Sequence, residues 1–262
     1  MTDKMNRRDF LKLAAGSLVV LTGSYKFLEN QGGGDPTKTG DQPTGKPRPS
    51  WAMVIDQEKC NGCEICIDVC KAHNDTNPEI NWTRIYPGDE IGGHKTFMPV
   101  PCMHCDNAPC VGVCPVKATY QRADGIVMMD YDRCIGCRYC ELACPYQARS
   151  FNWSKFDGEN PLVPEFGQPE VDRRPRGVVE KCSFCYQRID RGLANGLTPG
   201  IDRAATPACV VHCPQGARTF GDLNDPESPV SKVLANRPNF QMRPDLGTGP
   251  RVYYLSPIPE EV

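Results

Sequence analysis

The sequence predicts an α+β fold that is rich in loops and organised around bound metal rather than around a large apolar core. Three observations lead to this prediction. The chain of 262 residues has sixteen cysteines that sort into four sets of four with none left over. It has 25 prolines and 24 glycines, which favour turns over long helices or strands. Short segments around the cysteines recur along the chain, which indicates duplicated units.

The spacing of the cysteines identifies the metal group. The sets are Cys60, Cys63, Cys66 and Cys70; Cys102, Cys105, Cys110 and Cys114; Cys134, Cys137, Cys140 and Cys144; and Cys182, Cys185, Cys209 and Cys213. The first and third sets have the spacing C-x2-C-x2-C-x3-C, which is typical of [4Fe–4S] ligation in bacterial ferredoxins. At four thiolates per cluster, the sequence predicts four [4Fe–4S] clusters. We expect the apoprotein to be largely unfolded, because such folds draw stability from ligand–metal bonds.

The repeats predict duplicated bacterial-type ferredoxin modules. Residues 54–56 and 128–130 each end four residues before the first cysteine of a set, and we expect short strands there. A second repeat, Cys-Pro-x-x-Ala, begins at the last cysteine of three sets, at residues 114, 144 and 213. In two-cluster ferredoxins the fourth cysteine of each run binds the other cluster. We therefore predict four ligand groups: Cys102, Cys105, Cys110 and Cys144; Cys134, Cys137, Cys140 and Cys114; Cys60, Cys63, Cys66 and Cys213; Cys182, Cys185, Cys209 and Cys70.

Several neighbours of the cysteines have predicted roles. Gly62 and Gly136 admit positive φ, which would turn backbone N–H groups toward the cluster sulfurs. Three cations precede the first cysteine of a set, and they are either tuners of the reduction potential or solvated loop charges: Lys59, Arg133 and Lys181. Lys71 replaces the proline that follows the other last cysteines. It indicates either a differently poised cluster or a tolerated surface residue.

Other uses of the cysteines fit less well. A four-cysteine run followed by proline is not a zinc ribbon, and four ferredoxin-like sets would make an unusual disulfide framework. The four histidines are too scattered for a separate metal site: His73, His94, His104 and His212. The sequence has no phosphate-binding loop, dinucleotide fingerprint or nucleophile elbow, so we predict no catalytic residues. A net charge of −2 does not suggest a nucleic-acid surface.

The N-terminal residues predict an export signal. Residues 6–12, Asn-Arg-Arg-Asp-Phe-Leu-Lys, precede an apolar run at 13–21 and resemble a twin-arginine signal. No clear A-x-A cleavage site follows, so a retained anchor stays open. We predict a signal at 1–28, a flexible linker at 29–50, a four-cluster domain at 51–225 and a C-terminal extension at 226–262. No apolar run reaches the roughly 18 residues of a membrane span.

Taken together, the cysteine sets and the phrases RRPRGVVEKCSFC (173–185) and GARTFGDLNDPES (216–228) resemble a known family. These are the four-cluster ferredoxin-like electron-transfer subunits of respiratory complexes. The chain is most similar to the periplasmic iron–sulfur subunit of the membrane complex linked to dissimilatory sulfite reductase. The iron–sulfur subunits of nitrite, tetrathionate, polysulfide and dimethyl sulfoxide reduction are related.

The resemblance implies a non-catalytic electron-transfer subunit of an oxidoreductase complex, at the extracytoplasmic face of the membrane. It implies a multi-span quinone-interacting membrane subunit as one partner and a further haem, iron–sulfur or molybdopterin subunit as another. Two alternatives stay open: the electron-feeding subunit of a molybdopterin reductase, and a free periplasmic ferredoxin carrier. Residues 154–180 and 226–262 are either partner-binding surfaces or loops that cover the clusters.

Overall fold

The computed structural model describes residues 48–91 and 93–257. The predicted signal and nearly all of the predicted linker lie outside these residues. The first strand begins at Trp51, where the sequence places the start of the folded domain. No helix within the described residues is long and apolar enough to cross a membrane.

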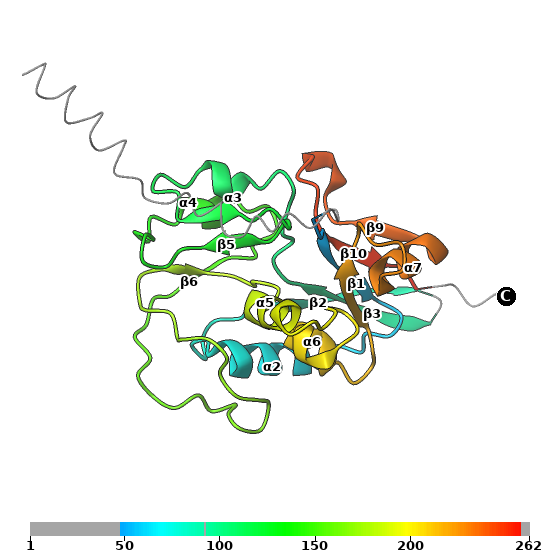
Figure 1. The fold of residues 1–262 in the computed structure, drawn as a ribbon, viewed down its shortest axis with the longest axis horizontal. Coiled ribbons are helices and arrows are strands. Elements are labelled where there is room, and N and C mark those ends of the chain that lie inside the picture. The colour runs from blue at the N-terminus through cyan, green and yellow to red at the C-terminus, as the bar shows by residue number, and fades with distance from the viewer. Residues whose placement is uncertain (1–47, 92, 258–262) are drawn as a thin grey trace, which may run out of the picture. The chain divides into compact units, whose positions relative to one another are not determined.

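The main sheet brings together segments from both ends of the described chain (Figure 1). Strand β1 (Trp51–Asp56) pairs in parallel with β10 (Val252–Leu255) and antiparallel with β8 (Arg218–Asp222). Strand β9 (Asn239–Gln241) pairs antiparallel with the outer edge of β10. The segment predicted to be a C-terminal extension is therefore part of the same sheet as the first strand.

Both faces of β1 are covered, which explains its unbroken apolar sequence. Trp51, Met53 and Ile55 face the main core, while Val54 packs with Val230 on the opposite side. Val230 belongs to α7 (Pro229–Asn236), which lies beside β1 and β10 in Figure 1. A strand buried on both faces reads as a continuous apolar run rather than an alternating one.

The remaining strands form short antiparallel pairs. These are β2 (Arg84–Ile91) with β3 (His94–Val100), β4 (Thr119–Gln121) with β5 (Val127–Met129), and β6 (Ser150–Phe151) with β7 (Val179–Glu180). The strands predicted before the first and third cysteine sets are confirmed as β1 and β5. The fold is α+β with duplicated ferredoxin modules, as the sequence predicts.

Each set of cysteines contributes at least its third residue to a helix. The helices are α2 (Ile65–Asn74), α3 (Pro109–Gly112), α4 (Tyr139–Leu142) and α6 (Ala208–Val211). Helix α3 packs against α4, and α2 packs against α6. The other helical segments are α5 (Tyr186–Ala194) and the single turns η2 (Arg203–Ala205) and η3 (Pro244–Leu246). The second and third sets are thus neighbours, as are the first and fourth.

Phe220 joins the sheet to the core. Its side chain is fully buried, stacks on Trp51 at 5.7 Å and meets Phe184 edge-on at 5.4 Å. Phe220→Ala is expected to destabilise the protein by about 3–5 kcal/mol, the usual cost of removing a buried aromatic ring. Anaerobic thermal unfolding of iron-loaded protein measures this as a fall in Tm. The control is Phe240→Ala on β9, where the ring is 36% exposed and the fall should be less than half as large. Equal falls would contradict the assigned role of Phe220.

Candidate iron–sulfur centre

The sixteen cysteines are all free thiols, and the structure gathers them into four groups. Two groups line pockets. The Cys60 group lines the first, and its members are Cys60, Cys63, Cys66 and Cys213. The Cys134 group lines the second, and its members are Cys134, Cys137, Cys140 and Cys114. Each group combines three cysteines of one set with the last cysteine of another.

The other two groups are identified by the mutual electrostatic effects of their thiols. In the Cys182 group, burial raises the pKa of Cys70 well above its usual value; the negative charges of Cys185, Cys182 and Cys209 add most to the rise, and Cys66 of the neighbouring group adds least. In the Cys102 group, burial raises the pKa of Cys105 to about 12, with Cys102, Cys110 and Cys144 adding to it. All sixteen cysteines therefore belong to a four-membered group.

One pair of cysteines joins each group to the next. Arg218 donates hydrogen bonds to the sulfurs of both Cys66 and Cys209, at 3.3 and 3.8 Å. Burial raises the pKa of Cys182, and nearby Cys102 contributes to the rise. Cys110 and Cys140 pack in one side-chain cluster. The groups therefore lie in a row, in the order Cys60, Cys182, Cys102 and Cys134.

Exposure follows the same order. Cys63 and Cys137 are the two exposed cysteines, and they belong to the groups at the two ends of the row. All four members of the Cys182 group are buried, and three of the four in the Cys102 group are buried. In each end group the buried cysteine is the one that faces inward, Cys66 or Cys140. The row reaches the surface at its ends and is enclosed in its middle.

The repeated Cys-Pro-x-x-Ala segment supplies backbone donors to sulfur. The Ala217 N–H donates to the Cys213 sulfur at 3.3 Å. The equivalent Ala148 N–H bonds Cys144 and partly offsets the rise in pKa that burial causes there. At Cys114, burial is outweighed by the N–H groups of Thr119, Ala118 and Val116, which lower its pKa. A hydrogen bond to sulfur stabilises the thiolate that an iron–sulfur cluster requires.

Gly62 and Gly136 adopt the predicted positive φ, at +73° and +68°. A Cβ at Gly136 would lie 2.2 Å from the carbonyl oxygen of Gly177, which no side chain tolerates. Burial raises the pKa of Cys60, and the Gly62 N–H opposes that rise by bonding its sulfur. Gly62 therefore provides both the turn and a sulfur donor, and Gly136 provides the turn.

The first set lacks the proline that follows the last cysteine of the other sets. There, among the described residues, a side chain, and not a backbone N–H group, donates a hydrogen bond to the last cysteine's sulfur. A residue before proline avoids helical geometry, so α3, α4 and α6 end before the last cysteine of their sets. Lys71 permits α2 to continue past Cys70 to Asn74, and the exposed Lys71 ammonium bonds the carbonyl of Pro78. Backbone N–H groups within a helix are taken by the helix. The Asn74 amide donates to the Cys70 sulfur at 3.6 Å and lies 3.9 Å from that of Cys185.

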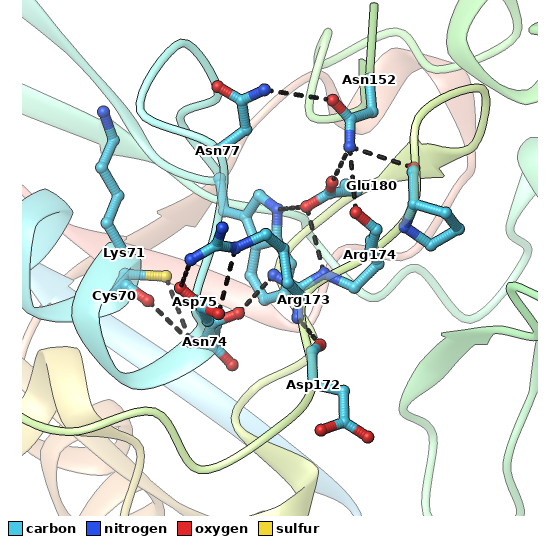
Figure 2. Close-up of polar contacts among 12 residues, drawn as sticks. Cys70, Lys71, Asn74, Asp75, Asn77, Asn152, Asp172, Arg173, Arg174 and Glu180 are labelled. Carbon is cyan, nitrogen blue, oxygen red and sulfur yellow. Dashed lines mark hydrogen bonds and ion pairs between the residues drawn. The ribbon is translucent and has the colours of Figure 1, made fainter. Parts of the chain in front are cut away.

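A polar network attaches the segment 152–180 to α2 (Figure 2). Arg173 forms a two-point ion pair with Asp75, with contacts of 3.1 and 2.9 Å. Arg174 donates to the backbone carbonyl of Asn74 and pairs with buried Glu180 at 3.3 Å. The contacts of these two arginines are therefore made within the domain, and they tie this segment to the end of α2.

The three cations that precede a first cysteine are not equivalent. Lys59 and Arg133 are exposed and pair with Asp56 and Asp130, at 4.0 and 3.1 Å. Lys181 is only 2% exposed. A cation that recurs at equivalent sequence positions is therefore not equally exposed at each of them. Sequence reasoning missed the sulfur donors Arg149 and Arg218, although the recurring Ala-Arg after Cys-Pro was a signal for them.

The donor set fits an iron–sulfur cluster. Within residues 48–91 and 93–257, no three His, Cys, Asp or Glu side chains converge tightly enough to share one metal ion. A cluster does not need such convergence, because each thiolate binds a different iron. Buried His104 accepts the Val127 N–H at 3.0 Å and stacks on Phe184, so it serves packing.

The Asn74 amide is expected to raise the reduction potential of the centre at Cys70, because a hydrogen bond to sulfur favours the more negative, reduced form. Asn74→Leu should lower that potential by roughly 20–65 mV, the equivalent of about 0.5–1.5 kcal/mol for one hydrogen bond. An anaerobic redox titration followed by electron paramagnetic resonance measures it. Asn236→Leu is the control, because the Asn74 and Asn236 amides both donate to the carbonyl four residues earlier, at 3.0 and 2.7 Å, and Asn236 has no sulfur partner among the described residues. An unchanged potential in Asn74→Leu would contradict the assignment.

Several known proteins are similar to this chain in sequence. Residues 94–159 match a 4Fe–4S dicluster domain, and residues 53–73 match a 4Fe–4S binding domain. The iron–sulfur cluster-binding subunit of menaquinone reductase from Nitratidesulfovibrio vulgaris is 42% identical, over 79% of this chain and 88% of its own. The Hdr-like menaquinol oxidoreductase iron–sulfur subunit 1 of Archaeoglobus fulgidus is 36% identical, over 95% and 97%.

A third relative is a subunit of tetrathionate reductase from Salmonella typhimurium, which is 34% identical over 95% of this chain and 88% of its own. With ferredoxin-type domains and relatives of this kind, the chain is an electron-transfer component rather than a catalytic one. It belongs to the family of 4Fe–4S iron–sulfur subunits of oxidoreductase complexes.

Proposed function

We propose that the chain binds four [4Fe–4S] clusters, one at each cysteine group, and relays single electrons along the row that they form. The Cys60, Cys182, Cys102 and Cys134 groups would each supply four thiolates. Each bound cluster would supply a site that takes up or releases one electron. The protein itself holds the thiolates, donates hydrogen bonds to them and excludes water from the two inner groups.

The arrangement of the groups carries this proposal. A store of clusters or a structural metal site needs no order, whereas a relay needs adjacent centres and two ends open to partners. Pairs of cysteines lie at each of the three junctions, and one exposed cysteine lies at each end. Burial of the middle favours transfer along the row over loss of electrons to solvent.

We infer that the Cys134 group faces a permanently bound redox subunit of the complex. Large apolar side chains surround the exposed Cys137: Ile135, Tyr139, Leu142 and Trp153, of which Leu142 is 79% and Ile135 63% exposed. The exposed sequence neighbours of Cys63 are polar, namely Asn61 and Glu64. Contiguous apolar surface is typical of lasting protein interfaces. Apolar character at one end supports a stable partner there.

The other proposed partner is a multi-span quinone-interacting membrane subunit, in a complex of sulfur-compound respiration. The relatives named for menaquinone and menaquinol reactions support the quinone link, and the tetrathionate reductase relative supports the sulfur link. We place the complex at the extracytoplasmic face of the membrane, because residues 6–12 resemble a twin-arginine signal. That route exports folded proteins, which suits a chain that must receive its clusters before export.

The test is anaerobic purification from gently solubilised membranes, with iron and molybdenum or tungsten measured in the same sample. Four clusters require about sixteen iron atoms per chain, and a content well below that would contradict the count. Co-purification with a multi-span subunit and haem-bearing partners without molybdenum supports the quinone-linked relay. A large molybdenum or tungsten partner would make the chain the electron-feeding subunit of a molybdopterin reductase. Recovery alone in the soluble fraction would make it a free carrier.

Charge substitutions near Cys137 test the proposed interface. Leu142→Glu combined with Ile135→Glu should weaken retention of the partner subunit by about tenfold, equal to about 1.4 kcal/mol. Iron content should stay unchanged, because both side chains are exposed. Leu193→Glu combined with Ile201→Glu is the matched control. These apolar side chains are also exposed, but they belong to the segment between Cys185 and Cys209 and not to the Cys134 group. Retention of the partner in the first variant would overturn the interface.

A further inference from the structure

Three cations among the residues that the structure describes are buried without an acidic partner. Arg218 is 6% exposed, and Lys181 and Arg149 are each 2% exposed. Within the part of the chain that the structure describes, no carboxylate forms an ion pair with any of them. Burying an unpaired charge is strongly unfavourable, so another negative group must compensate each cation.

Each of these cations lies at a different junction of the row. Arg218 bonds the sulfurs of Cys66 and Cys209, which join the Cys60 and Cys182 groups. Arg149 donates to the Cys110 sulfur at 3.0 Å and interacts electrostatically with Cys140, across the junction of the Cys102 and Cys134 groups. Three cations thus match three junctions.

Lys181 occupies the middle junction in a different way. Its ammonium donates to the backbone carbonyls of Val127 and Cys182, the latter at 2.9 Å, and makes no hydrogen bond to sulfur among the described residues. It interacts electrostatically with Cys102 and Cys182, the two cysteines that meet there. Its action on the clusters would therefore be that of a charge rather than of a hydrogen-bond donor.

Metal-bound thiolates are the available compensation. Arg149 already bonds the Cys110 sulfur at 3.0 Å and Arg218 bonds the Cys66 sulfur at 3.3 Å, so a thiolate charge there would lie in direct contact with each guanidinium. A coordinated thiol is deprotonated. Bound clusters would therefore compensate the cations.

We propose that the relay has one buried cation at each junction and that each cation raises the reduction potentials of the two clusters beside it. The cations are Arg218, Lys181 and Arg149. The proposal rests on the four-cluster function above. Reduction adds one electron to an anionic cluster, and a nearby cation in a low-dielectric interior stabilises the product. A cation shared by two clusters acts on both, whereas an exposed cation is screened by water.

The decisive comparison is Arg149→Gln against Arg133→Gln. Both remove one positive charge near the Cys134 group, but Arg149 is buried and Arg133 is exposed. Redox titration followed by electron paramagnetic resonance resolves the clusters. At a fixed potential, Arg149→Gln should shift the oxidised-to-reduced ratio of two clusters by about tenfold toward oxidised, which is 59 mV for one electron. The other two clusters, and all four in Arg133→Gln, should stay near wild type.

Further variants separate charge from folding. Arg149→Lys keeps the charge and should keep both potentials close to wild type, even if Arg149→Gln fails to retain its clusters. Lys181→Gln should shift the clusters of the Cys182 and Cys102 groups. A shift confined to one cluster, an equal shift in Arg133→Gln, or a Lys variant that behaves like the Gln variant would overturn the proposal. Wild-type protein with fewer than four clusters would instead overturn the proposed function, independently of these comparisons.

Discussion

Compensation of buried thiolate charge is the constraint on which the rest of this structure depends. Three kinds of donor meet it. Backbone N–H groups reach the sulfurs at the recurring alanine, as at Ala217 and Ala148. The side-chain amide of Asn74 does so where α2 continues past the last cysteine. Buried cations do so where two cysteine groups meet. The short helices, tight turns and many prolines are consequences, because they aim these donors at sulfur.

The same constraint predicts that folding is linked to metal loading. The described residues bury many cysteines and three cations without a carboxylate partner, so we expect bound metal, and not apolar burial alone, to stabilise the domain. The sheet β8–β1–β10–β9 provides the apolar part of the core around Phe220 and Tyr254. The sheet holds both ends of the described chain, so the loops between them are free to carry the cysteine ligands.

The two ends of the row differ although their cysteines do not. Each end group has one exposed, one buried and two half-buried cysteines. The exposed sequence neighbours of Cys137 include large apolar side chains such as Ile135 and Tyr139, whereas those of Cys63 are the polar Asn61 and Glu64. An interface is distinguished by what surrounds the exposed centre, because the centre itself is the same at both ends. The duplicated modules therefore have equivalent cysteines but different surroundings, which suits a different partner at each end.

The sequence by itself determined the local features of this protein. Cysteine spacing indicated the cofactor, the recurring Cys-Pro-x-x-Ala indicated the modules, and glycine at 62 and 136 indicated positive φ. These are set within one turn of chain, where residue type restricts the backbone directly. Only the tertiary structure decided that Lys181 is buried while Arg133 is exposed, and that Arg174 turns inward to Asn74. It also decided that β10 pairs with β1. Burial and long-range contacts arise from packing between distant segments, and no local pattern encodes which segments will meet.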